Sequence, residues 1–451
     1  MRQVDFSSGR VGRNILQTAL PMLVAQVLSL LYSIVDRIYI GRIPQTGTLA
    51  LGGIGLCFPM ITIITAFTNL YGLGGSPLCS IARGRGDRER AQEIMNTSYF
   101  MLLSTAILIT LLGEMFAVPI LTAFGATDAN LPIAVSYLRI YLLGTIFTMT
   151  AAGLNPYMTA QGFSSSAMVA VIIGAVSNIV LDPFFIFALH MDVRGAAVAT
   201  VLSQAFSALY VYRFLTGKQA ELKLRIITPS RFASRLSLAG EIVSLGMSAF
   251  VMQFTNSLVN IVCNSVLSSL GGELYVSIMT VVNSVRQITE TPVLAIAEGA
   301  SPVISYNYGA GRPQKVRRGI FLMAAMGLFY TAAVWILIER FPSFFIGIFS
   351  TDSTFMADAI PALHTYFFAF VFMALQYTGQ TTFKALGKKR HAIFFSLFRK
   401  VVIVVPLTIL LPRLFGLGTT GVFMAEPISN VIGGTACFVT MLLTVMPELG
   451  S

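Results

Sequence analysis

The chain has 451 residues, of which 55% are hydrophobic and only 11% are charged. Soluble domains carry about 25% charged residues, so this composition indicates a protein of the lipid bilayer and argues against a soluble enzyme. The formal net charge of +11 would suit a nucleic-acid partner, but the distribution of the basic residues gives another explanation.

Twelve stretches are long and apolar enough to cross a membrane, for which a helix needs about 20 mostly apolar residues. The first apolar run continues from Ile15 to about Val35, so we interpret it as a spanning helix and not as a cleaved leader. The predicted spans are 15–38, 50–76, 94–118, 132–153, 165–189, 194–216, 240–267, 273–300, 317–340, 358–382, 392–414 and 418–446.

The second half of the chain repeats the first at an offset of 225 residues. Ser76-Pro77 and the turn Gly84-Arg85-Gly86 recur as Ser301-Pro302 and Gly309-Ala310-Gly311. Because each half has six predicted spans, both halves enter the membrane in the same orientation, and their symmetry axis runs along the membrane normal. Two similar membrane halves are the usual architecture of a transporter, with the substrate path between them.

The predicted lobes are residues 1–218 and 239–451, joined by a cytoplasmic linker at 219–238. Loops on one side of the spans hold 23 of the 30 Lys and Arg residues, and this count includes Arg399 and Lys400. Cytoplasmic loops carry such an excess, so we expect both termini in the cytoplasm. The same bias explains the net charge without nucleic acid.

The sequence lacks the motifs of ATP-driven or enzymatic chemistry. It has no Gly-x-x-x-x-Gly-Lys-Ser/Thr loop, its four Cys have no metal-ligand spacing, and its three His are far apart. We therefore expect no ATP, no cofactor and no enzymatic activity. An ion gradient would then supply the energy for any pumping.

Ionised side chains at mid-bilayer cost about 2.5–3.5 kcal/mol on insertion scales and usually have a role. Asn178 and Asp182 share one helix face, and Pro183 cannot donate a backbone N–H. Carboxylate and amide oxygens there could replace the hydration shell of a hard cation, or a buried carboxyl could hold a proton. An Asp182 that is simply hydrogen-bonded to a neighbouring helix is the alternative.

Two further polar residues of the first half are weaker candidates by themselves. Asp36 lies near the end of the first span beside Arg37, where an interfacial carboxylate is equally reasonable. Thr200 lies in the sixth span, and a Thr in a membrane helix usually bonds its own backbone.

The second half carries four polar candidates for a gating or structural role. Arg286 and Glu290 are four residues apart and predict an ion pair inside the eighth span. Glu298 precedes Gly299 at the end of that span and could gate the inner face. Glu426-Pro427 breaks the twelfth span, and whether Glu426 forms a second cation site stays open.

At these residues the chain resembles the MATE family of transporters (multidrug and toxic compound extrusion). The resemblance runs from about residue 12 to 445. The motifs that carry it are Ile34-Val35-Asp36-Arg37, Gly74-Gly75-Ser76-Pro77, Asn178-Ile179-Val180-Leu181-Asp182-Pro183, Glu298-Gly299 with Pro302, and Tyr306-Asn307-Tyr308-Gly309-Ala310. It implies an all-α membrane fold of twelve helices in two pseudo-symmetric six-helix lobes that form a V.

The resemblance also implies a function and its residues. It implies a multidrug antiporter of the bacterial inner membrane, which exports cationic or amphipathic compounds in exchange for Na+ or H+. The residues that match the family's cation site are Asp36, Asn178, Asp182 and Thr200. The candidates for the substrate cavity are Asn155, Gln26 and Met149, and Pro21 matches a bend in the first helix.

One departure from the family pattern selects a branch. Another branch has acids in the seventh and tenth spans, whereas this chain has Asn256, Asn260 and Asn264 in the seventh. The chain therefore resembles the DinF-like and MepA-like members, with coupling in the first lobe. No metal site is expected beyond a possible Na+ at the coupling residues.

Two other functions remain as alternatives, a dedicated metabolite exporter and a flippase for a lipid-linked precursor. A flippase should line its cavity with basic residues, and we place only Arg139 and Arg286 within spans, which disfavours this function. The expected protein acts as a monomer in the bilayer, and the sequence does not choose between Na+ and H+ or name the substrate.

Overall fold

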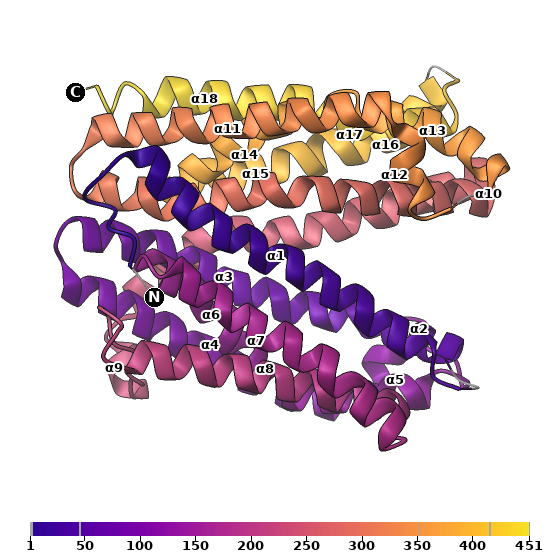
Figure 1. Ribbon diagram of the computed structural model, residues 1–451, viewed down its shortest axis with the longest axis horizontal. Coiled ribbons are helices and arrows are strands. Elements are labelled where there is room, and N and C mark those ends of the chain that lie inside the picture. The colour runs from indigo at the N-terminus through magenta and orange to yellow at the C-terminus, as the bar shows by residue number, and fades with distance from the viewer. Residues whose placement is uncertain (1–2, 45–46, 351, 415, 451) are drawn as a thin grey trace. The chain divides into compact units, whose positions relative to one another are not determined.

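The computed structural model describes residues 3–44, 47–350, 352–414 and 416–450, and within these ranges it is helical with no strand (Figure 1). The all-α prediction is therefore confirmed. The chain divides into two compact units. Unit 1 comprises residues 1–5 and 24–246, and unit 2 comprises residues 6–23 and 247–451.

Unit 1 is built from long apolar helices that pack side by side in Figure 1, with α3 against α4 and α6, and α7 against α8. Its elements are most of α1 (Val11–Gly41), α2 (Gly47–Gly55), α3 (Phe58–Gly84), α4 (Arg88–Ala123), α5 (Leu131–Leu143), α6 (Thr145–Ala160), α7 (Ser164–Pro183), the π-helical η1 (Phe184–Ala188), α8 (Asp192–Thr216), α9 (Pro229–Ala233) and the start of α10 (Leu236–Gly309).

Unit 2 contains the start of α1, the rest of α10 and every later element, with α14 packed against α11 and α18, and α16 against α17. The later elements are α11 (Pro313–Arg340), α12 (Pro342–Gly347), α13 (Ser353–Phe367), α14 (Phe372–Ala385), α15 (Lys389–Leu397), the π-helical η2 (Phe398–Val404), α16 (Val405–Leu414), α17 (Thr419–Ser429), the π-helical η3 (Asn430–Gly434) and α18 (Thr435–Val445).

Helix α10 contains two spans. Its 74 residues would measure about 110 Å as one straight helix, more than three times the thickness of the hydrocarbon core. Gly272 interrupts it with φ +68°, a conformation that glycine adopts without strain. Val259 and Val282, on opposite sides of this break, belong to one buried cluster, so the two parts fold back on each other.

The remaining spans agree with the predicted number. Within the described ranges, nine helices are long and apolar enough to cross a membrane, and two bent pairs bring the number to 11. The pairs are α5 with α6, bent by 54°, and α13 with α14, bent by 46°. Dividing α10 at Gly272 then gives twelve.

The 225-residue repeat is visible in the structure. Helix α3 ends at Gly84 and α10 at Gly309, and both Gly86 and Gly311 have positive φ in the turns that follow. Equivalent side chains also tie equivalent helices together. The amide of Asn155 donates to the carbonyl of Ala167 at 2.9 Å, and Gln380 donates to Ala392 at the same distance.

In each unit, loops that were assigned to the basic side lie together. In unit 1, Arg83 pairs with Glu221, and the Leu222 N–H donates to Gln161 Oε1 at 2.8 Å, so the 217–235 segment joins the ends of α3 and α6. In unit 2, Lys388 pairs with Glu448, which joins the end of α14 to the end of α18.

Helix α3 and the start of α10 touch backbone to backbone within unit 1. A Cβ on Gly74 would collide with the Ile242 carbonyl, and one on Gly246 would collide with the Leu70 carbonyl. Only glycine permits this separation, so these positions set how closely the two helices pack.

We expect Gly246→Ala to destabilise the protein by roughly 1–3 kcal/mol, because the added methyl group forces the helices apart. The midpoint of thermal unfolding in detergent measures this. Gly240→Ala is the matched control, since it lies on the same helix with nothing within 4 Å of an added Cβ. Equal midpoints for the two variants would contradict the packing argument.

Candidate functional site

Unit 1 brings the predicted coupling residues together from three helices. Asp36 comes from α1, Asn178 and Asp182 from α7, and Thr200 from α8. Asp182 is fully buried, Asn178 is almost fully buried, and Asp36 and Thr200 are partly buried. Residues separated by more than 160 positions in the sequence therefore share one site.

Asn178 orders this cluster through both hydrogens of its amide group. Its Nδ2 donates to Asp182 Oδ1 at 3.3 Å and to Thr200 Oγ1 at 3.4 Å. Helix α7 ends at Pro183, and the π-helical η1 follows, so the backbone geometry changes immediately after the carboxylate. Thr200 is thus linked to the cluster through its hydroxyl group.

The cluster presents oxygen atoms that lack a hydrogen-bond donor. Asp36 Oδ1, Asn178 Oδ1 and Asp182 Oδ2 are all buried without one. The carboxyl groups of Asp36 and Asp182 lie within hydrogen-bonding reach of each other. Two ionised carboxylates that face each other repel, so a proton or a metal cation between them would stabilise the arrangement.

The charge of Arg37 lies within electrostatic range of the Asp36 carboxyl group. No ion pair forms to Asp36 or Asp182 within the described ranges, and Arg37 instead lies over the Phe58 ring, 5.3 Å from its centroid. Tyr137, which the sequence reasoning missed, is buried within electrostatic range of both carboxyls. The only sequence signal for Tyr137 is its position in the apolar fourth span.

The three residues proposed for the substrate cavity, Asn155, Gln26 and Met149, differ in burial and in contacts. Asn155 uses its amide to bond the Ala167 carbonyl, which the repeat duplicates at Gln380. Met149 is completely buried inside unit 1, and Gln26 is partly buried on α1. Their role in binding substrate stays a prediction.

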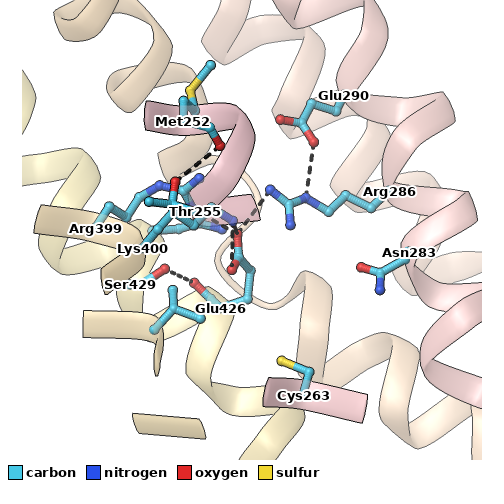
Figure 2. A network of polar contacts seen from close by, with 12 residues as sticks. Met252, Thr255, Cys263, Asn283, Arg286, Glu290, Arg399, Lys400, Glu426 and Ser429 are labelled. Carbon is cyan, nitrogen blue, oxygen red and sulfur yellow. Dashed lines mark hydrogen bonds and ion pairs between the residues drawn. The ribbon is translucent and has the colours of Figure 1, made fainter. Parts of the chain in front are cut away.

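Unit 2 holds a separate network of charged side chains around Glu426 (Figure 2). Three cations bond its Oε1 atom: Arg286 Nη2 at 3.0 Å, Arg399 Nη1 at 2.8 Å and Lys400 Nζ at 3.0 Å. The predicted pair of Arg286 with Glu290 is present, at 3.1 Å from Nε to Oε2. Three positive donors therefore surround this carboxylate, and a cation-binding role for Glu426 stays untested.

The assignment of Arg399 and Lys400 to a cytoplasmic loop was wrong. Both lie on η2, inside the apolar span Lys389–Leu414, and Lys400 is only 3% exposed. They are tolerated there because Glu426, on α17, pairs with them. Their position inside the predicted span 392–414 was the available signal, but their partner Glu426 lies 27 residues after Arg399 and 26 after Lys400.

Other groups complete the unit 2 network. The Tyr377 hydroxyl donates to Glu290, Arg286 Nη1 donates to the Tyr366 hydroxyl at 2.9 Å, and Arg399 also bonds Asn430 Oδ1 at 2.8 Å. Glu298 lies outside this network, partly buried within electrostatic range of Lys384. The three predicted residues Arg286, Glu290 and Glu426 are therefore joined, and Glu298 is not among them.

The MatE family model matches residues 21–184 and 248–410, one match in each half of the repeat. The chain belongs to the MatE family. It is therefore a transporter and not an enzyme, as the sequence predicted, and the resemblance to MATE transporters is confirmed.

Relatives and solved structures match this chain over almost its full length. The Multidrug export protein MepA of Staphylococcus haemolyticus is 25% identical over 97% of this chain and 94% of its own length. The MepA of Staphylococcus aureus is 24% identical over 98% and 94%. A crystal structure of MATE in complex with MaD3S covers 100% of both chains with a TM-score of 0.92 at 24% identity, which shows the MATE fold.

We expect Glu426→Gln to destabilise this MATE protein by roughly 3–5 kcal/mol, because it leaves three buried cations around a neutral amide. Thermal unfolding in detergent measures the loss. Adding Lys400→Met should recover part of it, since one uncompensated charge is then removed. Glu339→Gln, whose partner His364 is about one-third exposed, is the control and should cost at most about 1 kcal/mol.

Proposed function

We propose that this chain is an antiporter that exports cationic or amphipathic organic compounds in exchange for Na+ or H+. The observation that carries the proposal is the facing pair Asp36 and Asp182, with buried oxygens that lack donors. Such a pair is stabilised when it gains one positive charge and destabilised when it loses it, which is the property that a coupling site needs.

The proposed coupling site has Asp36 and Asp182 as the charged members. Asn178 positions Asp182 and Thr200 through its amide hydrogens, and its own Oδ1 remains available to a cation. A proton would bridge the two carboxyls, whereas Na+ would take carboxylate, amide and hydroxyl oxygens, which are the ligands that hard cations prefer. Both ions use the same residues.

Drug and ion would affect each other's binding through a conformational change of the protein. In the proposed cycle, the cation enters from outside, binds the carboxylate pair and favours a conformation with low affinity for the drug. Coupling is reciprocal by thermodynamic necessity, so drug and ion must weaken each other's binding by the same factor. The two lobes of the repeat, 1–218 and 239–451 with the linker 219–238, would move relative to each other during this cycle.

The substrate class rests on the relatives. Two of them are named multidrug export proteins, and they match this chain over almost its full length. We infer a monomer in the inner membrane of a bacterium, with both termini in the cytoplasm. The gathering of basic loops at one end of each unit supports this orientation.

A flippase would need basic residues in its cavity, and Arg399 and Lys400 lie within a span, which raises the number of cations there. These cations share Glu426 with Arg286, and Glu290 also pairs with Arg286. The excess is one positive charge, too little to compensate a doubly or triply charged pyrophosphate. Export of smaller organic compounds remains the better-supported function.

We expect Asp182→Asn to reduce gradient-driven dye efflux at least about tenfold, because a neutral amide cannot exchange the charge that couples transport. The measurement is dye release from proteoliposomes, with Na+ and H+ gradients imposed separately. The gradient that drives wild-type protein identifies the ion. Asp192→Asn is the control, since Asp192 is exposed in the first turn of α8 and its positive φ of 50° suits Asn.

The proposal fails if Asp182→Asn retains wild-type, gradient-dependent efflux. It also fails if neither gradient drives efflux by the wild-type protein while purified protein still binds the dye.

A further inference from the structure

The network in unit 2 has more positive than negative charge. Its cations are Arg286, Arg399 and Lys400, and its carboxylates are Glu290 and Glu426. With every group ionised, one positive charge is uncompensated among the described residues. Burying a net charge is costly, so a third anion would stabilise this region.

Lys400 has a single carboxylate partner, which it shares with other cations. Its Nζ bonds only Glu426, at 3.0 Å and 3.3 Å, and Glu426 is shared with two arginines. An ammonium group has three N–H donors, so one of them has no acceptor in the part of the chain that the structure describes. The Lys400 side chain is nevertheless only 4% exposed.

Lys400 is one of the residues that line a cavity. This cavity has a volume of about 350 Å³, lies wholly within unit 2, and is lined by all five charged residues of the network. Its other walls combine amides with apolar side chains, among them Asn256, Asn260, Asn283, Met252, Met279 and Val404. Pockets of about 300–1,000 Å³ with apolar walls and a few placed polar groups are typical of small-molecule sites.

The backbone positions the two cations of η2 toward this cavity. Arg399 and Lys400 lie on a π-helical segment, and Asn430, which accepts from Arg399, begins another. Such segments are rare and frequently occur at functional sites. Gly433 makes room for the stem of Arg399, because a Cβ there would contact its Cγ at 2.9 Å. Figure 2 shows Arg286, Arg399 and Lys400 converging on Glu426.

We propose that this cavity binds the oxyanion of an amphipathic organic substrate, such as a carboxylate or sulfonate. The excess positive charge and the free donor of Lys400 receive the oxyanion, the amides bond its polar neighbours, and the Met and Val side chains contact its apolar body. The substrates then include anionic and zwitterionic compounds. The inference deepens the proposed export function and rests on it for the transport of the ligand, but not for its binding.

The test compares a rhodamine that has a free carboxylate with its methyl ester. The ester keeps the ring system of the dye and replaces the charged carboxylate with a neutral, slightly larger group. We expect purified full-length protein, in nanodiscs of phosphatidylcholine, to bind the acid at least about tenfold more tightly than the ester, since a hydrogen bond to a charged group contributes about that much. Fluorescence anisotropy gives both dissociation constants. Equal affinities would overturn the proposal.

Two variants change the charge of the network in opposite directions. Lys400→Met makes it neutral and should abolish the preference for the acid, whereas Glu290→Gln adds to the excess and should increase the preference. Lys384→Met is the matched control, because Lys384 is a partly buried lysine of unit 2 that does not line the cavity. A purely structural role predicts that the first two variants lose affinity for both dyes, and this result would contradict the proposal.

The last arm distinguishes an organic substrate from a lipid headgroup. Adding phosphatidylglycerol to the nanodiscs should leave the preference for the acid intact. If this lipid removes the preference, a phosphate of the bilayer occupies the cavity and the substrate assignment is wrong. Binding needs no ion gradient, so a failed coupling site at Asp182 would leave the acid-over-ester preference unchanged, and the two proposals fail separately.

Discussion

A charge inside the hydrocarbon core must find its partner within the protein, because no water is available there to solvate it. This constraint explains the two polar sites of the molecule. In unit 2, the Glu426 carboxylate lies among Arg286, Arg399 and Lys400, and the resulting ion pairs allow a lysine to stay almost completely buried. In unit 1, Asp36 and Asp182 face each other, and neither forms an ion pair within the described ranges, which is why we propose that a coupling ion binds there.

The repeat accounts for the framework but not for these charges. The turns at Gly86 and Gly311 and the interhelical bonds from Asn155 and Gln380 are duplicated at the same offset. The charged residues are not duplicated. Positions 225 before Arg399 and Lys400 hold Gly174 and Ala175, and position 225 after Asp182 holds Leu407. The two halves share a helical framework and differ in their polar sites.

The two proposals assign opposite chemistry to unit 1 and unit 2. In them, the carboxylate pair of unit 1 binds a cation, and the network beside the cavity of unit 2 binds an anion. If both sites act in one transport cycle, the coupling ion and the charged group of the substrate are held by different halves of the repeat. A substrate with a carboxylate then has a place to bind that does not compete directly for the carboxylates of unit 1.

The sequence by itself determined the membrane class, the twelve spans, the repeat and the candidates Asp36, Asn178 and Asp182, because hydropathy, turn glycines and the i, i+4 spacing are local properties of a helix. Long-range partners are not local. That Glu426 bonds Arg399 and Lys400, that Asp36 meets Asp182 across two helices, and that Asn155 bonds Ala167 were decided only by the tertiary structure. Helix packing selects which side chains approach each other, and in a bilayer this selection decides whether a charge is tolerated.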